Sequence, residues 1–170
     1  MSEDSNFNAI FGGVVPTATI SRDYGSFRSE LDQSLTPSLI PQPIGLEITD
    51  ISEGIIINAD GTIGVTEIGI YMVEATIVFS HNEPVTADTG YVYLVKGGVD
   101  VVGSTRLLRL NVNINAFTLS VSYLVNITDT SAETLSLYFT ATSTDLQIEY
   151  STFATIPNAS SVICNVFQIA

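Results

Sequence analysis

Residues 58–71 read NADGTIGVTEIGIY and combine a turn signal, a short apolar stretch and a Gly-Ile-Tyr sequence. The pair Asp60-Gly61 lies between two apolar runs, and an Asp-Gly pair supplies the positive φ angles of a type I′ turn at low cost. We therefore expect a two-residue hairpin here. Gly69 precedes a long strand that starts at Tyr71, and we expect it either to let another stretch of backbone approach closely or to relieve a bend.

From residue 44 onward, apolar and polar residues alternate with a period of two, which is the pattern of strands that cover one face of a core. The clearest alternating runs are 71–80, 119–127, 135–141 and 146–150. Turn-rich segments separate these runs, and no helical pattern interrupts them. The sequence therefore predicts an all-β sandwich or barrel and excludes alternating βαβ units.

Two segments are apolar on both faces instead: residues 54–58 read GIIIN, and residues 160–170 read SSVICNVFQIA. A strand buried on both sides has no place on the outside of a single sandwich. We therefore expect one face to meet the core and the other to meet a second subunit. The candidate residues for this subunit interface are Ile55, Ile56, Ile57, Ile163, Phe167 and Ile169.

Residues 1–43 differ in composition from the rest of the chain and hold four of its six prolines. Prolines at this density favour an extended segment over regular structure. We therefore expect an N-terminal attachment arm over residues 1–43 and a globular domain over residues 44–170. Within the arm, apolar residues at helical spacing across residues 23–35 suggest a short amphipathic helix.

The arm carries apolar side chains suited to docking on a larger particle, because an extended segment that orders on a partner must bury something in return. The candidate attachment residues are Phe7, Ile10, Phe11, Val14, Val15, Phe27 and Leu31. The rival expectation is an arm that packs along its own oligomer or crosses to a neighbour within it.

The chain is strongly acidic, with 18 acidic residues, 5 basic residues and a formal net charge of −13. A deficit of lysine and arginine argues against binding to nucleic acid or to anionic membranes. Lys96, Arg106 and Arg109 could pair with a neighbouring subunit, although ordinary edge-strand charges explain them better. The N-terminal residues lack the basic and apolar regions of a signal peptide, so we expect synthesis in a cytoplasm.

Catalysis has little support in the sequence. His81 is the only histidine and is expected to be a solvated turn residue. Cys164 is the only cysteine, which excludes an intrachain disulfide, and its apolar neighbours suggest an inert buried thiol. No G-x-S-x-G nucleophile motif is present. We therefore expect no catalytic residue and a protein that is not an enzyme.

Metal and cofactor sites are also not expected. No Cys/His cluster could hold zinc. The carboxylate pairs Glu83 with Asp88 and Asp129 with Glu133 each share a loop and could hold a calcium ion. Solvated loop charges explain them better, because no D-x-D-x-D spacing appears.

The order of these elements resembles the C1q and tumour-necrosis-factor-like jelly roll. In that superfamily a short hairpin leads into a Gly-x-Tyr that opens a long strand, as in EIGIYMVEATIVF at residues 67–79. FTLSVSYLVNITDTSAETLSLYF at residues 117–139 is similar to a later pair of family strands joined by an acidic turn. The resemblance covers residues 44–170, implies a jelly-roll β-sandwich and implies a homotrimer around an apolar three-fold contact.

The resemblance also suggests a setting. Members outside animals include knobs and spikes on phage particles and spore surfaces, whereas the secreted animal members carry features absent here, such as a collagen repeat and a disulfide. The expected function is therefore a non-enzymatic virion surface protein, either a capsid decoration or cement protein or a head spike, held to other virion proteins by its arm. The alternative is a receptor-binding knob of a phage tail fibre that recognises a host surface glycan or protein.

Overall fold

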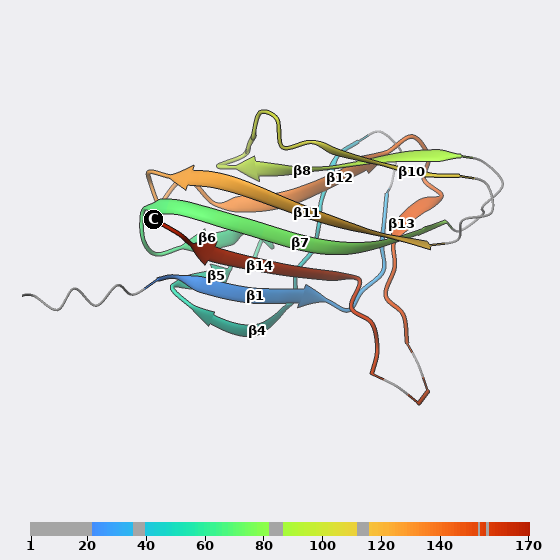
Figure 1. Ribbon diagram of the computed structural model, residues 1–170, viewed down its shortest axis with the longest axis horizontal. Helices are drawn as coiled ribbons and strands as arrows, with labels where there is room; N and C mark the ends of the chain where they lie inside the picture. The colour runs from blue at the N-terminus through green and yellow to red at the C-terminus, as the bar shows by residue number, and fades with distance from the viewer. Residues whose placement is uncertain (1–21, 36–39, 82–86, 112–115, 153, 156) are drawn as a thin grey trace, which may run out of the picture.

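The computed structural model describes residues 22–35, 40–81, 87–111, 116–152, 154–155 and 157–170. All regular structure in these ranges is β, in two sheets that stack as a sandwich (Figure 1). The strands are β1 (Tyr24–Ser29), β2 (Gln33–Ser34), β3 (Gln42–Pro43), β4 (Ile48–Glu53), β5 (Ile55–Ile57), β6 (Ile63–Val65), β7 (Gly69–His81), β8 (Asp88–Lys96), β9 (Val99–Asp100), β10 (Arg106–Leu110), β11 (Ala116–Ile127), β12 (Leu135–Ala141), β13 (Leu146–Ile148) and β14 (Val162–Gln168).

The first sheet, called sheet A, has the order β4-β1-β14-β7-β11; β13 pairs with the last three residues of β7, and β2 pairs with β13. The second sheet, called sheet B, has the order β10-β8-β12-β6-β5, with β9 beside β8 and β3 beside β12. Every strand pair is antiparallel. The prediction of an all-β jelly-roll sandwich is confirmed.

The core lies between the two sheets and follows the predicted alternation. In β7, the inward side chains are buried and the intervening ones lie on the outer face. In β11 and β12 the same pattern places Tyr123 and Phe139 in the core. The alternation of apolar and polar residues in the sequence therefore predicted correctly which face of each long strand lies in the core, because each of these strands turns one face to the opposite sheet.

The β5–β6 hairpin differs from its prediction in turn type. Gly61 has the expected positive φ of 80°. However, the Gly61 amide donates to the Asn58 carbonyl at 2.9 Å, so Ala59 and Asp60 are the central residues of the turn. This is a three-residue loop in which Gly61 follows the turn in the left-handed region, and the expected two-residue type I′ turn is wrong. The Asp60 carboxylate stabilises the loop by accepting hydrogen bonds from the Thr62 amide and hydroxyl.

Replacing Gly61 with Val should destabilise the domain by about 1–3 kcal/mol, the cost of forcing a β-branched residue into the left-handed region. No heavy atom lies within 4 Å of where the new Cβ would be, so the effect comes from the backbone alone. Urea denaturation measures it. Asparagine tolerates the left-handed region better than valine, so Gly61→Asn should lose less stability. Equal losses of stability for the two variants would show that backbone strain is not the cause.

Gly69 behaves as predicted, because a Cβ at this position would collide with the backbone carbonyl of Ala170. The close approach lets the Ile70 amide donate to the Ala170 carbonyl at 2.6 Å. Two residues later, the buried Tyr71 hydroxyl donates to the Glu67 carbonyl at 2.8 Å and lies 3.1 Å from Asp23 Oδ2. The Gly-Ile-Tyr sequence therefore fastens the start of β7 to the C-terminal strand and to the entry of β1.

The expectation of a helix across residues 23–35 is wrong, since β1 occupies residues 24–29 between β14 and β4. Within β1, every second residue is buried: Gly25, Phe27 and Ser29. This alternation extends over only six residues, so in the sequence it was less apparent than the helical spacing of the apolar residues. The expected boundary at residue 44 is also wrong, because β1 and β2 both pair within sheet A. Residues 1–21 of the expected arm lie outside the described ranges.

Candidate interaction surfaces

The outer face of sheet A carries a row of apolar side chains. Strand register places Leu124, Met72 and Phe167 side by side on β11, β7 and β14, and Tyr24 of β1 lies next to Phe167. Leu124 is 64% exposed and Phe167 is 38% exposed. These strands lie side by side, and the row crosses the end of the sheet where the C-terminus lies (Figure 1).

A second apolar row borders the first. Ile70 precedes Met72 by one step on the outer face of β7, and the Ile169 amide donates to the Ile70 carbonyl at 2.8 Å. Both isoleucines are exposed. We call the two rows together the sheet A patch; its members are Tyr24, Ile70, Met72, Leu124, Phe167 and Ile169. Exposed apolar surfaces of this kind mark interaction sites.

The middle of the same face is polar. Glu74, Thr76, Ser120, Ser122 and Asn165 line a hollow of about 300 Å³ with their side chains on neighbouring strands. The Thr76 and Ser120 hydroxyls lie 3.3 Å apart. The outer face of sheet A thus joins an apolar end to a polar centre.

The edge of the sandwich beside β11 forms a groove. One hollow of about 270 Å³ lies between Val99, Val101 and Leu124. A second of about 300 Å³ lies between Val101, Val102 and Leu124 and continues the first. Val102 is 99% exposed and Val99 is 70% exposed. Leu124 belongs to both the groove and the sheet A patch, so the apolar surface runs from the face around the edge.

The predicted subunit-interface residues fall into two groups. Ile163, Phe167 and Ile169 all lie on the outer face of sheet A; Phe167 and Ile169 belong to the sheet A patch, whereas Ile163 lies opposite Thr76 in the polar middle of the face. Ile55 is fully buried in the core, while Ile56 is exposed and Ile57 half-buried on β5, the end strand of sheet B. The structure therefore brings the C-terminal group together on one face and separates the β5 group from it.

Of the residues of this surface, the sequence predicted only Phe167 and Ile169, and Leu124, Val99 and Val102 are the most exposed of those it missed. Leu124 occupies a position of β11 where the neighbouring outward residues are serine and asparagine, so the alternation itself could have identified it as an exposed apolar side chain. Val99 and Val102 lie in a glycine-rich stretch without periodicity, so no pattern predicted their exposure.

Of the predicted attachment residues, only Phe27 and Leu31 lie in the described ranges. Phe27 is fully buried between the sheets and has no surface for a partner. Leu31 is 59% exposed. Phe7, Ile10, Phe11, Val14 and Val15 lie outside the described residues.

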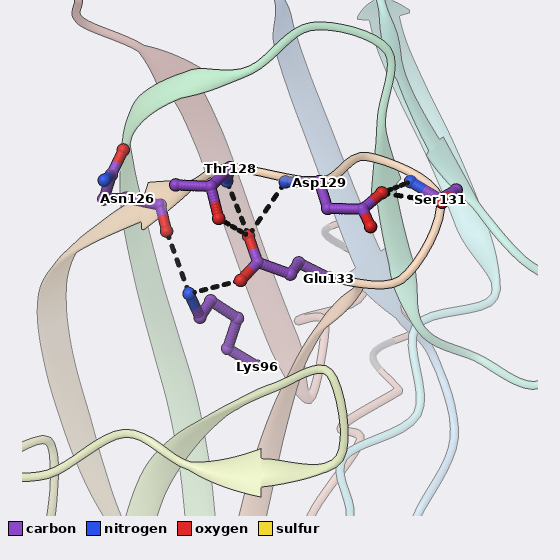
Figure 2. Close-up of polar contacts among 6 residues, drawn as sticks. All are labelled: Lys96, Asn126, Thr128, Asp129, Ser131 and Glu133. Carbon is purple, nitrogen blue, oxygen red and sulfur yellow. Dashed lines mark hydrogen bonds and ion pairs between the residues drawn. The ribbon is translucent and has the colours of Figure 1, made fainter.

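The β11–β12 turn contains the carboxylate pair Asp129 and Glu133, and Figure 2 shows how its atoms are used. Glu133 Oε1 accepts from Lys96 Nζ at 2.8 Å, and Oε2 accepts from the amides of Thr128 and Asp129. Asp129 Oδ1 accepts from the Ser131 amide and hydroxyl. Both carboxylates therefore stabilise the turn, and no cluster of three potential metal ligands occurs among the described residues.

These hydrogen bonds hold the pKa of Glu133 at about 2, with the bond from Lys96 as the largest cause. A carboxyl pKa below its unfolded value stabilises the folded state above about pH 4.5, and that contribution disappears as the pH falls toward 2. Wild-type protein should therefore unfold at a higher temperature than Glu133→Gln at pH 7, and the two should converge near pH 2. If the difference in unfolding temperature between the two proteins stays constant from pH 7 to pH 2, the Glu133 carboxylate is not the source of the stabilisation.

His81 is not the solvated turn residue that we expected. It ends β7 with a fully enclosed side chain, and its Nε2 lies 3.2 Å from Oδ2 of Asp88, whose side chain is 5% exposed. Cys164 is buried as expected, and burial raises the pKa of its thiol to about 12. Neither side chain is accessible to a substrate in the described structure.

The outer face of sheet B has a different character, with three half-buried tyrosines: Tyr91, Tyr93 and Tyr138. The rings of Tyr93 and Tyr138 stack with centroids 5.9 Å apart and an interplanar angle of 29°. Leu107 lies opposite Tyr91 on β10 and is 51% exposed. This face therefore lies on the opposite side of the sandwich from the sheet A patch.

Within the described ranges, no helix is long and apolar enough to cross a membrane.

Comparison with solved structures gives matches over nearly the whole domain. The chain is similar to murine APRIL at pH 5.0, with a TM-score of 0.55 and 7% identity over 87% of this chain and 99% of that chain. It is similar to Eiger TNF from S. frugiperda, with a TM-score of 0.53 and 8% identity over 88% of this chain and 93% of that chain.

The globular domain of zebrafish complement 1qA protein is also similar, with a TM-score of 0.51 and 10% identity over 88% of this chain and 98% of that chain. No protein-family model matches the sequence, and no curated protein does either. The described chain therefore has the C1q and tumour-necrosis-factor-like jelly-roll fold.

Proposed function

We propose that this chain is a non-enzymatic structural protein of a virion surface that assembles as a homotrimer. It decorates or cements a capsid, or forms a small head spike, and residues 1–21 attach it to the particle. The observation that carries the proposal is the apolar surface that runs from the sheet A patch around the β11 edge. Its presence on one side of a C1q and tumour-necrosis-factor-like sandwich fits self-association, because large exposed apolar surfaces are rare on monomeric proteins.

Two different surfaces support a trimer rather than a symmetric pair. The sheet A patch is a face, whereas the groove at Val99, Val102 and Leu124 is an edge. When the edge of one subunit packs on the face of the next, the contact is heterologous, and it forms a closed ring when the rotation between subunits is about 120° for a trimer. The contact also covers β11, a 12-residue edge strand that would otherwise invite uncontrolled pairing.

The virion setting rests on the resemblance of the sequence to jelly rolls displayed on particles. The net charge of −13 fits a displayed protein that stays soluble and avoids nucleic acid. The absence of enzyme activity is supported by the enclosure of His81 and Cys164.

Deleting residues 1–21 should leave folding and trimer formation intact but abolish binding to the particle. This segment holds five of the seven predicted attachment residues. Co-sedimentation with particles that lack the protein measures the binding, and full-length protein is the control. Normal occupancy by the truncated protein would place attachment on the jelly roll and contradict the proposal.

A receptor-binding knob of a tail fibre is the second candidate function. The tyrosine-rich outer face of sheet B favours it, because tyrosine is enriched where proteins bind partners. Electron microscopy of the source particle separates the two candidates: a decoration protein is present in many copies over the capsid, and a fibre knob in few copies at fibre tips.

A further inference from the structure

On the outer face of sheet B, side chains form three parallel rows: one on β8, one on β12 and one on β10 and β9. Along β8, the outward residues are Thr89, Tyr91, Tyr93 and Val95. Register places Thr140, Tyr138 and Ser136 beside them on β12, and Arg109, Leu107 and Asp100 beside them on β10 and β9. Val95 and Ser136 are buried and the Thr140 hydroxyl has no exposed surface, so the accessible grid that these rows form consists of tyrosine rings, Leu107, the Thr89 side chain and two charged ends.

The two charges lie at opposite ends of the tyrosines. Arg109 is opposite Thr89 and Asp100 is opposite Val95, which are six residues apart on β8, or about 20 Å. Arg109 is exposed and forms no ion pair with any described residue. One cation and one anion cancel, so this grid is neutral on a chain whose net charge is −13.

The rings between these ends are held in place. Tyr93 and Tyr138 support each other through their stacked contact, so little side-chain freedom is lost when a ligand covers them. Burial, followed by the nearby Asp100 carboxylate, raises the pKa of Tyr93 and keeps its hydroxyl neutral. The three hollows described above all lie elsewhere, on sheet A and on the β11 edge.

We infer that the outer face of sheet B binds a neutral oligosaccharide, which lies along β8 with its sugar rings on the tyrosines. The flat rings offer apolar faces with polar tips, and the Thr89, Arg109 and Asp100 side chains donate to and accept from sugar hydroxyls. The net charge of the chain disfavours a polyanion. The inference rests on the receptor-binding candidate and gives it a ligand class, but it depends on neither trimer formation nor particle attachment.

The test titrates the full-length protein with maltohexaose, cellohexaose and mannohexaose, each to about 10 mM. Isothermal titration calorimetry measures binding, because the tyrosine variants remove two of the seven tyrosines on which a fluorescence signal would depend. Hexagalacturonate is the acidic comparator and a neutral hexapeptide is the peptide comparator. At least one neutral hexasaccharide should bind more tightly than both comparators. The double variant Tyr93→Thr and Tyr138→Thr should weaken that binding by about tenfold or more, and Arg109→Gln should weaken it as well.

Sedimentation of the same samples separates this inference from the proposed function. The tyrosine variants should keep the wild-type mass, whereas Leu124→Asp should change the mass and keep saccharide binding per chain. The inference is overturned if none of the three neutral saccharides binds, if a comparator binds as tightly, or if the folded tyrosine variants bind as well as wild type.

Discussion

Replacing Phe27 with Ala should reduce the free energy of unfolding by about 3–5 kcal/mol, the range for truncating a buried phenylalanine. Phe27 is fully buried on β1, and its ring and Ile55 of sheet B both lie against Gly25. The substitution therefore leaves a cavity between the two sheets. Chemical denaturation of the full-length protein measures the loss.

Leu31→Ala is the matched control, because Leu31 is an apolar residue of the same segment that is 59% exposed. Its substitution should change stability by no more than about 0.5 kcal/mol. The comparison also separates two accounts of residues 22–35. If this segment were an arm outside the domain, both substitutions would leave unfolding unchanged, and that result would contradict the position of β1 in sheet A.

Replacing Leu124 with Asp should convert the proposed trimer to a monomer at micromolar concentration. Leu124 belongs to both the sheet A patch and the β11 groove, so it would lie at the contact from either side of the interface. Burying an unpaired carboxylate there would cost several kcal/mol per site. Because Leu124 is 64% exposed in the single chain, the variant should still fold.

Leu107→Asp is the control for this substitution. Leu107 is an exposed leucine on the outer face of sheet B, on the layer opposite the sheet A patch, and its variant should remain a trimer. Light scattering coupled to gel filtration measures both masses. If Leu107→Asp dissociates the protein and Leu124→Asp does not, the interface is on sheet B and the proposed arrangement is wrong.

The long strands could be predicted from the sequence because each presents one face to the core. Period two therefore marked Tyr71, Tyr123 and Phe139 as inward residues, and the structure confirms all three. Gly69 was also predicted correctly, because a glycine before a long strand often marks a close backbone contact.

Other features depend on contacts distant in sequence and could not be predicted locally. Residues 24–29 form a strand because they pair with β14, which lies more than a hundred residues later. No local pattern in residues 24–29 indicates this pairing. The burial of His81 depends in the same way on Asp88 meeting it between the strands. For the β5–β6 hairpin, Asp60-Gly61 fixed the positive φ but not the loop length, which depends on where Asn58 and Thr62 pair.

The candidate surface was predicted in part. The two-sided apolar character of β14 led us to expect Ile163 and Phe167 at a subunit interface; the structure places both on the outer face of sheet A, and their contact with a second subunit stays a prediction. The same reasoning failed to separate Ile55 from them, because a run of three isoleucines does not show which of them faces the core. Only the register of sheet A brings Leu124 and Met72 beside Phe167 and defines a continuous patch.

Sedimentation equilibrium of the full-length protein at micromolar concentration tests the central claim most directly, that the sheet A patch and the β11 edge join the chain into a trimer. The chain has a mass of 18.2 kDa, and the account predicts a single species of three times that mass. A single species of 18.2 kDa under the same conditions would contradict it.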